Sequence, residues 1–492
     1  MNSVQIPQDV RKVENWIAGR FEPGSGPEIA VISPYSGTKV GVLRASTSAD
    51  VDRAVRAAAQ AALLWGRTPL KERCGVLFRF REVLLRDLDK ISQTISLESG
   101  KTLAEGKAGL LKGVEVLEFA LSLQNLDAGG RMEVSRGVFC EYRREALGVV
   151  AGITPFNFPA MVPMWMMPIA IGVGNAFVWK PSDKTPMTPA LIAQAWKEAG
   201  LPDGVLTVVH GGRETVEAVL DHPEIRAVGF VGSTPVARSV YERGSRSGKR
   251  VLALGGAKNP IILMPDADGE MASRGIADSF TGCAGQRCMA ASLLIGVGDC
   301  EKILDQVVEK AKAIRLGPDM GALISRESRE RLVKAIEKAV EEGATLRLDG
   351  RQAQAPADYA GGNWLGPTIL DHVKPGTSAA CDELFGPLIS VVRVKTLSEA
   401  LEIEASLPFG NAASVFTSNG AVAERVAQEA RAGMIGVNIG VPVPREPFSF
   451  GGFYDSKFGS GDITGASGVE FWSDRKKITV KWSAASDKNW MN

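Results

Sequence analysis

Short apolar runs alternate with helical segments from residue 148 onward, and this alternation limits the folds that the chain can adopt. Four runs of strand length are apolar: 148–153, 177–179, 205–209 and 227–231. Helical segments separate them; one begins at Thr188, has Pro189 in its first turn and ends near Gly200. Alternating strands and helices predict a parallel sheet covered on both faces, with a ligand crevice at the carboxyl ends of its strands.

The stretch from Pro159 to Val178 holds no charged residue, which by itself is compatible with a membrane span. Prolines and glycines interrupt it, and no second span or basic flank accompanies it. We therefore interpret it as a buried helix that leads into a buried strand. The first residues, MNSVQIPQDV, lack the charged and apolar regions of a signal peptide, so we expect a cytoplasmic protein.

Composition excludes several classes of function. The 492 residues are enough for two or three domains, and the net charge of +1 provides no strong field toward nucleic acid or a membrane surface. The six cysteines form no C-x-x-C pair, and the chain has three histidines, so we predict no metal site. Without a secretion signal, free thiols are expected, and one of them is a candidate catalytic group.

The remaining segments predict further helices and strands. Helical spacing of apolar residues marks 49–65, 70–91 and 101–125. After residue 254 a second alternating region predicts strands near Ile261, Leu294, Leu388, Ser414 and Ile435, and helices near 270–282, 300–313, 326–342 and 420–431. The segments 131–146 and 476–482 alternate like strands. They could be edge strands paired with another subunit, or they could pair only within the chain.

Cys288 is the candidate nucleophile. It ends the sequence Gly-Gln-Arg-Cys at a predicted junction between helix and strand. The positive charge of Arg287 and nearby backbone N–H groups would lower the pKa of its thiol and make it reactive. The alternative is a buried and inert cysteine, which is the more common environment of a free thiol.

Polar groups follow the predicted parallel strands at the crevice. Asn157, in Pro-Phe-Asn-Phe-Pro, could donate to a developing oxyanion, or could simply satisfy a turn. Lys180 and Asp183 follow the second strand and suit ribose hydroxyls. Gly232 and Ser233 follow the fourth strand, where a helix N-terminus can hold a phosphate. No G-x-G-x-x-G sequence is present, so each of these loops could also be an ordinary turn.

Taken together, these motifs resemble the aldehyde dehydrogenase superfamily over nearly the whole chain. They are PFNFP, WKPS, FVGST, the Leu254-Gly255-Gly256 sequence, GQRC and ELFGP, in the family's order and approximate spacing. The resemblance implies an α/β protein with a Rossmann-type parallel-sheet coenzyme domain, a second α/β catalytic domain and a β-strand oligomerisation arm. We expect the coenzyme domain at 1–124 and 147–253, the catalytic domain at 254–440, and the arm and tail at 125–146 and 441–492.

The resemblance also implies roles for individual residues. Cys288 is then the nucleophile, with Asn157 and the backbone N–H of Cys288 as the oxyanion hole. The implied NAD-binding residues are Phe156, Lys180, Asp183, Gly232, Ser233, Leu254, Glu383 and Phe385. Asp183 would repel a 2′-phosphate, so NAD is expected in preference to NADP. The implied assembly is a homodimer or homotetramer.

One departure from the family pattern concerns the acyl acceptor. Most hydrolytic members carry glutamate just before the Leu-Gly-Gly sequence as the base that activates water, and this chain has Ala253 there. A thiol acceptor needs less help from a base, because it is partly ionised near neutral pH. The loss of this glutamate and the segments PFNFPAMVPMWM, GGAKN and AGQRCMA together resemble the CoA-acylating methylmalonate-semialdehyde dehydrogenases.

Those enzymes use arginines to hold the substrate carboxylate, and here Arg287 and Lys112 are the implied substrate-binding residues. Lys112 lacks the bidentate fork of an arginine. We expect NAD-dependent oxidation of a small semialdehyde through a thioester on Cys288, with CoA as co-substrate. The alternative is a non-acylating dehydrogenase for another small anionic aldehyde.

Overall fold

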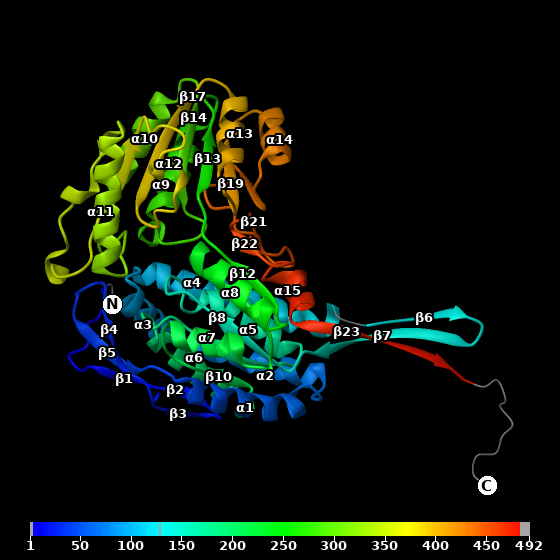
Figure 1. Cartoon of the computed structure of the whole chain (residues 1–492). Helices are drawn as coiled ribbons and strands as arrows, with labels where there is room; N and C mark the ends of the chain where they lie inside the picture. The colour runs from blue at the N-terminus through cyan, green and yellow to red at the C-terminus, as the bar shows by residue number, and fades with distance from the viewer. Residues whose placement is uncertain (1–2, 127–128, 483–492) are drawn as a thin grey trace, which may run out of the picture.

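The computed structural model describes residues 3–126 and 129–482. Figure 1 shows two α/β units, one above the other, and a long ribbon of strands that projects from the lower unit. The lower unit is built on a sheet of eight strands and the upper unit on a sheet of seven strands. The described part of the chain contains no helix long and apolar enough to cross a membrane.

The eight-stranded sheet has the predicted parallel centre. Its order is β22-β12-β11-β8-β9-β10-β2-β3. The strands are β22 (Lys457–Phe458), β12 (Arg250–Leu254), β11 (Ile225–Val231), β8 (Val149–Ile153), β9 (Ala176–Lys180), β10 (Leu206–Val208), β2 (Asn15–Ile17) and β3 (Arg20–Glu22). The strands from β12 to β10 are parallel. β9 and β11 lie on opposite sides of β8, so the strand order reverses at β8. At such a point the neighbouring loops run in opposite directions and leave a crevice at the carboxyl ends of the strands.

Helices cover both faces of this sheet. One face packs on α1 (Ser48–Trp65), α7 (Arg213–Asp221) and α8 (Thr234–Arg246). The other packs on α2 (Leu70–Arg86), α3 (Leu88–Ser99), α4 (Leu103–Leu126), α5 (Met161–Gly172), α6 (Met187–Glu198) and α15 (Gly465–Phe471). The single helix predicted over 70–91 is wrong, because Asp87 divides it into α2 and α3.

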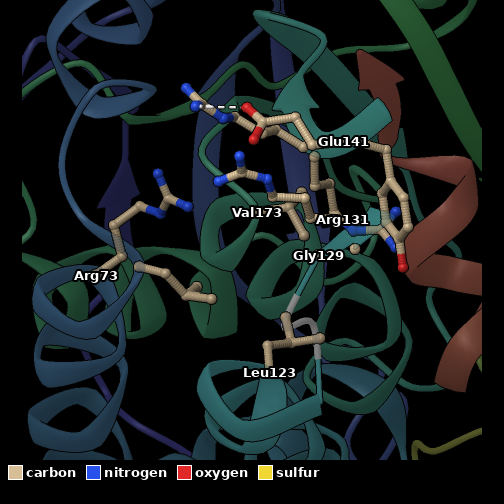
Figure 2. Close-up of a pocket in the computed structure, with 11 residues that line it drawn as sticks. Arg73, Leu123, Gly129, Arg131, Glu141 and Val173 are labelled. Atoms are coloured by element: carbon tan, nitrogen blue, oxygen red, sulfur yellow. Dashed lines mark hydrogen bonds and ion pairs between the residues drawn. The ribbon is translucent and has the colours of Figure 1, made fainter. Parts of the chain in front are cut away.

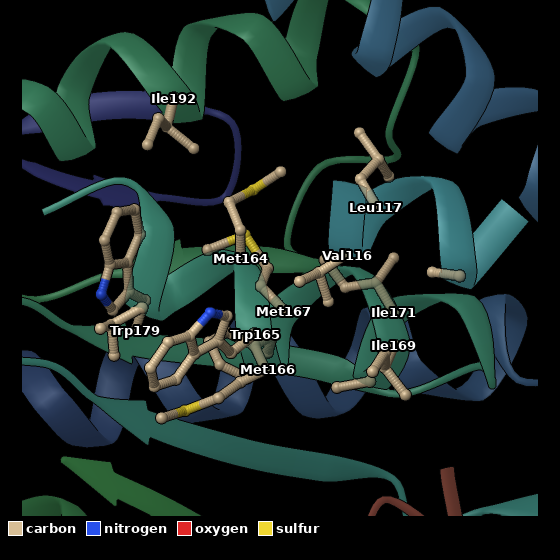
Figure 3. Packing of buried hydrophobic residues seen from close by; sticks show 14 of the residues in the cluster. Val116, Leu117, Met164, Trp165, Met166, Met167, Ile169, Ile171, Trp179 and Ile192 are labelled. Atoms are coloured by element: carbon tan, nitrogen blue, oxygen red, sulfur yellow. The ribbon is translucent and has the colours of Figure 1, made fainter. Parts of the chain in front are cut away.

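The apolar stretch that resembled a membrane span is the buried helix α5 followed by β9, as predicted. Every residue of α5 is buried. Figure 3 shows its side chains, among them Met164, Trp165 and Met167, packed with Val116 and Leu117 of α4 and with Ile192 of α6. A helix that is apolar on all sides is stable in water only when it is covered on all sides.

The seven-stranded sheet confirms the second α/β region. Its order is β15 (Thr345–Leu348), β16 (Thr368–Asp371), β17 (Leu388–Val394), β14 (Ala291–Val297), β13 (Asn259–Leu263), β19 (Ala412–Phe416) and β20 (Met434–Val437), and only β15 is antiparallel to its neighbour. Its helices are α9 (Gly269–Thr281), α10 (Glu301–Lys312), α11 (Arg326–Glu341), α12 (Ser378–Cys381), α13 (Leu397–Ser406) and α14 (Gly420–Glu429).

Small elements complete the two units. A three-stranded sheet has the order β1 (Arg11–Val13), β5 (Lys39–Arg44) and β4 (Glu28–Ile32), and β18 (Phe409–Gly410) pairs with β21 (Phe453–Tyr454). The 3₁₀ helices are η1 (Gly282–Gly285), η2 (Gly350–Gln352) and η3 (Ala357–Tyr359).

The projecting ribbon is a sheet of three strands in the order β23 (Ser473–Lys481), β7 (Val138–Ala146) and β6 (Gly130–Ser135). The predicted strands at 131–146 and 476–482 are thus confirmed, and they pair with each other within the chain. Within the described residues, β6 and β23 each keep one edge without a strand partner. Within the predicted arm and tail segment 441–492, β22 joins the eight-stranded sheet, whereas β23 belongs to the ribbon.

A cavity of about 550 Å³ lies where the ribbon leaves the lower unit, and Figure 2 shows arginines around it. Arg73 is buried and donates to the carbonyls of Gly172 and Thr68, 2.9 and 2.7 Å away. Arg143 pairs with Glu141. The Arg73 contacts lie within the lower unit and the Arg143–Glu141 pair lies within β7, so these arginines have partners inside the protein. Cys288 is not among the residues that line this cavity.

The side chain of Asn175 joins the ribbon to the core. It is completely buried, and its Oδ1 accepts from the N–H groups of Leu147 and Gly148 at 2.8 and 3.1 Å. Its Nδ2 donates to the carbonyls of Ala170 and Trp472 at 3.0 and 2.8 Å. One amide therefore fixes the end of α5 and the roots of β7 and β23.

We predict that Asn175→Ala lowers the unfolding temperature more than the loss of an exposed asparagine. The substitution leaves buried backbone groups without partners, each at a cost of about 1–3 kcal/mol. Asn419→Ala is the matched control, because Asn419 caps α14 at the surface and such a cap is worth about 1 kcal/mol. Scanning calorimetry compares the variants, and equal transitions for the two would contradict the role given to Asn175.

Candidate active site

The loop before Cys288 makes a tight left-handed turn after α9. Cys283, Ala284 and Gly285 have φ angles of 57°, 51° and 67°. Non-glycine residues in this region cost about 1–3 kcal/mol each, so surrounding contacts must hold the turn. A Cβ on Gly285 would lie 1.9 Å from the carbonyl oxygen of Gly386, so only glycine permits this loop to dock on the ELFGP segment.

Two asparagines fix the backbone of the predicted nucleophile. The carbonyl of Cys288 accepts from Asn259 Nδ2 at 2.7 Å and from Asn411 Nδ2 at 2.9 Å. Both asparagines are buried. The sequence analysis gave neither of them a role. The available signal was an amide side chain at the start of an otherwise apolar strand, which requires a partner when buried.

Asn157 lies at the same loop as Cys288. Its Nδ2 donates to the carbonyl of Gln286 at 2.9 Å, and the side chain is buried. Gln286 is anchored in turn, because its Oε1 accepts from the N–H of Ile324 at 3.0 Å. The amide of Asn157 has a second N–H. The structure therefore brings the predicted oxyanion donor and the predicted nucleophile together.

The environment of Cys288 differs from the prediction. Burial among apolar side chains and, to a smaller extent, the charge of Glu383 raise the pKa of its thiol to about 12. Arg287 and Lys101 act in the opposite direction and are outweighed. The charge of Arg287 does lower the pKa of the thiol, as expected, but burial outweighs it, so the pKa lies above its ordinary value rather than below it.

The side chain of Glu383 packs closely against the backbone of the Leu254-Gly255-Gly256 sequence. Its Oε1 accepts from the N–H of Ala257 at 3.0 Å, and a Cβ on Gly256 would lie 2.4 Å from its Oε2. Burial raises the pKa of Glu383 to about 7, although Arg331 and Lys258 oppose this shift. The carboxyl group therefore changes its charge near neutral pH.

The predicted coenzyme residues lie along the crevice of the eight-stranded sheet. Lys180, at the end of β9, is buried; burial lowers the pKa of its ammonium group, and the charge of Asp183 opposes the shift. The rings of Phe156 and Phe385 are 6.0 Å apart in an edge-to-face arrangement. The loop after β8 thus meets the ELFGP segment of the upper unit.

The start of α8 suits a phosphate group. Ser233 is the N-cap residue, and its hydroxyl makes no capping hydrogen bond. The N–H of Gly232 donates to the carbonyl of Leu254 at 3.1 Å, which keeps the ends of β11 and β12 together. Open N–H groups and the positive end of the helix dipole favour an anion here.

The two predicted substrate cations have partners within the protein. Arg287 donates to the carbonyls of Asp278 and Ser279 at the end of α9. Lys112 Nζ pairs with Glu115 Oε2 at 2.7 Å, on the same helix. The polar contacts of these two side chains are therefore with α9 and α4.

Ala253 is completely buried in β12, between Phe230 of β11 and Phe458 of β22. Its neighbours in the core are apolar. A glutamate at this position would place a carboxylate among apolar side chains, which is costly. Ala253→Glu is therefore a poor way to restore a water-activating base.

Comparison with known proteins gives a consistent result. The profile of the aldehyde dehydrogenase family matches residues 21–478. Malonate-semialdehyde dehydrogenase 2 of Geobacillus kaustophilus is 40% identical over 482 residues, covering 96% of this chain and 99% of that protein. The rat mitochondrial enzyme named methylmalonate-semialdehyde/malonate-semialdehyde dehydrogenase [acylating] is 40% identical over 481 residues, which are 96% of this chain and 90% of that protein.

Solved structures agree with the sequence comparison. Methylmalonate-semialdehyde dehydrogenase from Oceanimonas doudoroffii has a TM-score of 0.95 at 38% identity, covering 97% of this chain and 99% of that chain. A Sinorhizobium meliloti protein crystallised with NAD has a TM-score of 0.96 at 36% identity, covering 98% and 100%.

We predict that Cys288→Ala abolishes aldehyde oxidation and that Cys283→Ala keeps most of it. Cys288 lies at the loop that Asn157 contacts, whereas Cys283 is buried in the turn before it. Steady-state NADH absorbance measures both variants. A folded Cys283→Ala protein without activity would show that the nucleophile has been assigned to the wrong residue.

We also predict that Glu383→Gln makes Cys288 easier to alkylate. Above pH 7, Glu383 becomes an anion and raises the pKa of the thiol, so its removal should lower that pKa. At pH 8.5 we expect iodoacetamide to react up to about tenfold faster, which corresponds to about one pKa unit. Asp382→Asn, at the exposed neighbouring position, is the control; mass spectrometry of the Cys288 peptide provides the rates, and an unchanged rate contradicts the coupling.

Proposed function

This chain belongs to the aldehyde dehydrogenase family, and from that premise we propose that it oxidises a small semialdehyde with NAD and transfers the acyl group to CoA. Malonate or methylmalonate semialdehyde is the proposed substrate, after the relatives of about 40% identity. The observation that carries the proposal is the convergence of Asn157 and the Cys288 loop, with Ala253 where a carboxylate base would be required.

The first half of the reaction builds a thioester. Cys288 loses its proton and its sulfur attacks the aldehyde carbon, which places negative charge on the aldehyde oxygen. An N–H of Asn157 would stabilise that charge, together with the backbone N–H of Cys288. The hydrogen bonds from the side-chain amides of Asn259 and Asn411 hold the backbone of Cys288 in place during this step.

The crevice residues fit NAD. Lys180 and Asp183 would bind the adenosine ribose, and the open N-terminus of α8 at Ser233 suits the pyrophosphate. Glu383 would bind the nicotinamide ribose, and Phe156 and Phe385 would flank the ring. When bound, the coenzyme supplies a hydride acceptor.

The second half transfers the acyl group. Water attack needs a base, and the position before Leu254 holds an alanine buried in the core. A CoA thiol is partly ionised near neutral pH and needs less help. With a β-carboxylate on the acyl group, loss of carbon dioxide gives a shorter acyl-CoA.

Binding of a carboxylated substrate would require the two cations to change partners. Arg287 would turn from the carbonyls of α9, and Lys112 would exchange Glu115 for the substrate.

A non-acylating dehydrogenase for another small anionic aldehyde is the second candidate function. The Lys112–Glu115 pair favours it, because this pair weakens one of the two positions proposed to bind the substrate carboxylate.

We further propose the division into a coenzyme domain at 1–124 and 147–253, a catalytic domain at 254–440, and an arm and tail at 125–146 and 441–492. The open edges of β6 and β23 support a homodimer or homotetramer formed through the arm. We also propose that the protein acts in the cytoplasm.

We predict a burst of NADH near one per active subunit when CoA is absent, followed by a slow steady rate. Without a base for water, the thioester should accumulate after one turnover. CoA should raise the steady rate by an order of magnitude or more, in line with the ~10²–10⁴-fold that a general base usually contributes. Stopped-flow absorbance with malonate semialdehyde measures both phases.

The outcome that contradicts the acylating proposal is fast turnover without CoA and without a burst. It would mean that another group, such as Glu383, activates water. The dehydrogenase assignment would remain.

A further inference from the structure

Lys101 is a buried cation between the two loops of the proposed active site. Its side chain is 4% exposed, and its Nζ lies 2.7 Å from Cys283 Sγ, in the turn that leads to Cys288. The same Nζ lies 3.7 Å from the centre of the Phe158 ring, directly after the oxyanion donor Asn157. One ammonium group therefore contacts both loops.

The backbone aims Lys101 at this position. Gly100 ends α3 with φ = 82°, and a Cβ there would lie 2.4 Å from the carbonyl oxygen of Ala322. The N–H of Ala322 donates to the carbonyl of Gly100 at 2.8 Å, and Tyr35 donates its hydroxyl to the carbonyl of Lys101 at 3.1 Å. The backbone of residues 100 and 101 is thus held by one hydrogen bond from the upper unit and one from the lower unit.

A second contact from the same segment holds the strained turn. Glu105, in the first turn of α4, accepts from the N–H of Cys283 through Oε1 at 2.5 Å and from the N–H of Thr102 through Oε2 at 2.9 Å. Among the described residues, no carboxylate forms an ion pair with Lys101, so its charge is not cancelled by a direct partner. In a low-dielectric interior such a charge acts at longer range than in water.

We propose that Lys101 is a positioning residue for the nucleophile, one that holds the turn before Cys288 and favours its thiolate. This inference rests on the proposed role of Cys288. The charged groups around Cys288 are Glu383, which opposes ionisation, and Arg287 and Lys101, which favour it. The guanidinium of Arg287 is bound to the carbonyls of α9, whereas the ammonium of Lys101 faces sulfur and an aromatic ring.

The test measures the thiol directly, so it does not depend on the substrate. The rate at which iodoacetamide alkylates Cys288 is followed from pH 6.5 to 10 by mass spectrometry of its peptide. Lys101→Met should slow alkylation at pH 8 by about threefold or more and shift the profile to higher pH, because a nearby positive charge is lost. Lys101→Arg should keep the profile closer to that of the wild type.

Two controls separate charge from structure. Lys107→Met removes an exposed lysine of the following helix α4, paired with Asp89, and should leave the profile unchanged. Cys283→Ala removes the thiol partner but keeps the charge of Lys101, and should move the profile less than Lys101→Met. The unfolding temperature shows whether each variant is folded.

A folded Lys101→Met protein whose alkylation profile superimposes on that of the wild type would overturn the proposal. If Lys101→Met does not fold, Lys101→Gln and Lys101→Arg are compared instead. Alkylation must then be slower in Lys101→Gln than in Lys101→Arg. If no semialdehyde is oxidised and the shift is still seen, the proposed function fails and the role of Lys101 stands.

Discussion

The geometry of the site depends on the hydrogen-bonded side chain of Asn259. Its Nδ2 donates to the carbonyls of Cys288 and Ala290, at 2.7 and 3.0 Å, and its Oδ1 accepts from the N–H of Ala412 at 3.1 Å. One amide at the start of β13 thus joins the starts of β14 and β19. The backbone of the proposed nucleophile is therefore anchored to the seven-stranded sheet, whereas Asn157 lies in the loop that follows β8 of the other sheet. The distance between nucleophile and oxyanion donor is fixed by how the two units meet.

One backbone contact between the units tolerates no side chain. A Cβ on Gly321, in the upper unit, would lie 1.9 Å from the carbonyl oxygen of Gly100, in the lower unit. Burial is the main cause that raises the pKa of both Cys288 and Glu383. Because the dielectric inside a protein is lower than in water, the charges of Glu383, Arg287 and Lys101 each influence the Cys288 thiol.

Local patterns predicted most of the fold, because strands and helices are specified by neighbouring residues. The runs that became β8, β9 and β11 are apolar throughout, as buried parallel strands must be. The break between α2 and α3 was missed because Arg86-Asp87-Leu88 contains neither glycine nor proline. Sequence neighbours also misled the electrostatic prediction. Arg287 precedes Cys288, yet its guanidinium turns back to α9, while the cation that faces the turn before Cys288 comes from residue 101.

Contacts between distant residues have no local signature, and they decide what the site can bind. The motifs correctly indicated which loops meet at the crevice, but not that Lys112 is held by Glu115 or that Arg287 is held by carbonyls. A substrate carboxylate must compete with these internal partners, so affinity depends on the difference between two sets of contacts. An arginine fork binds a carboxylate through two parallel bonds, while a lysine offers a single point charge. If Lys112 and Arg287 hold the substrate carboxylate as proposed, the internal pair at Lys112 would lower the advantage of a carboxylated aldehyde over an uncharged one, and selectivity would depend mainly on Arg287.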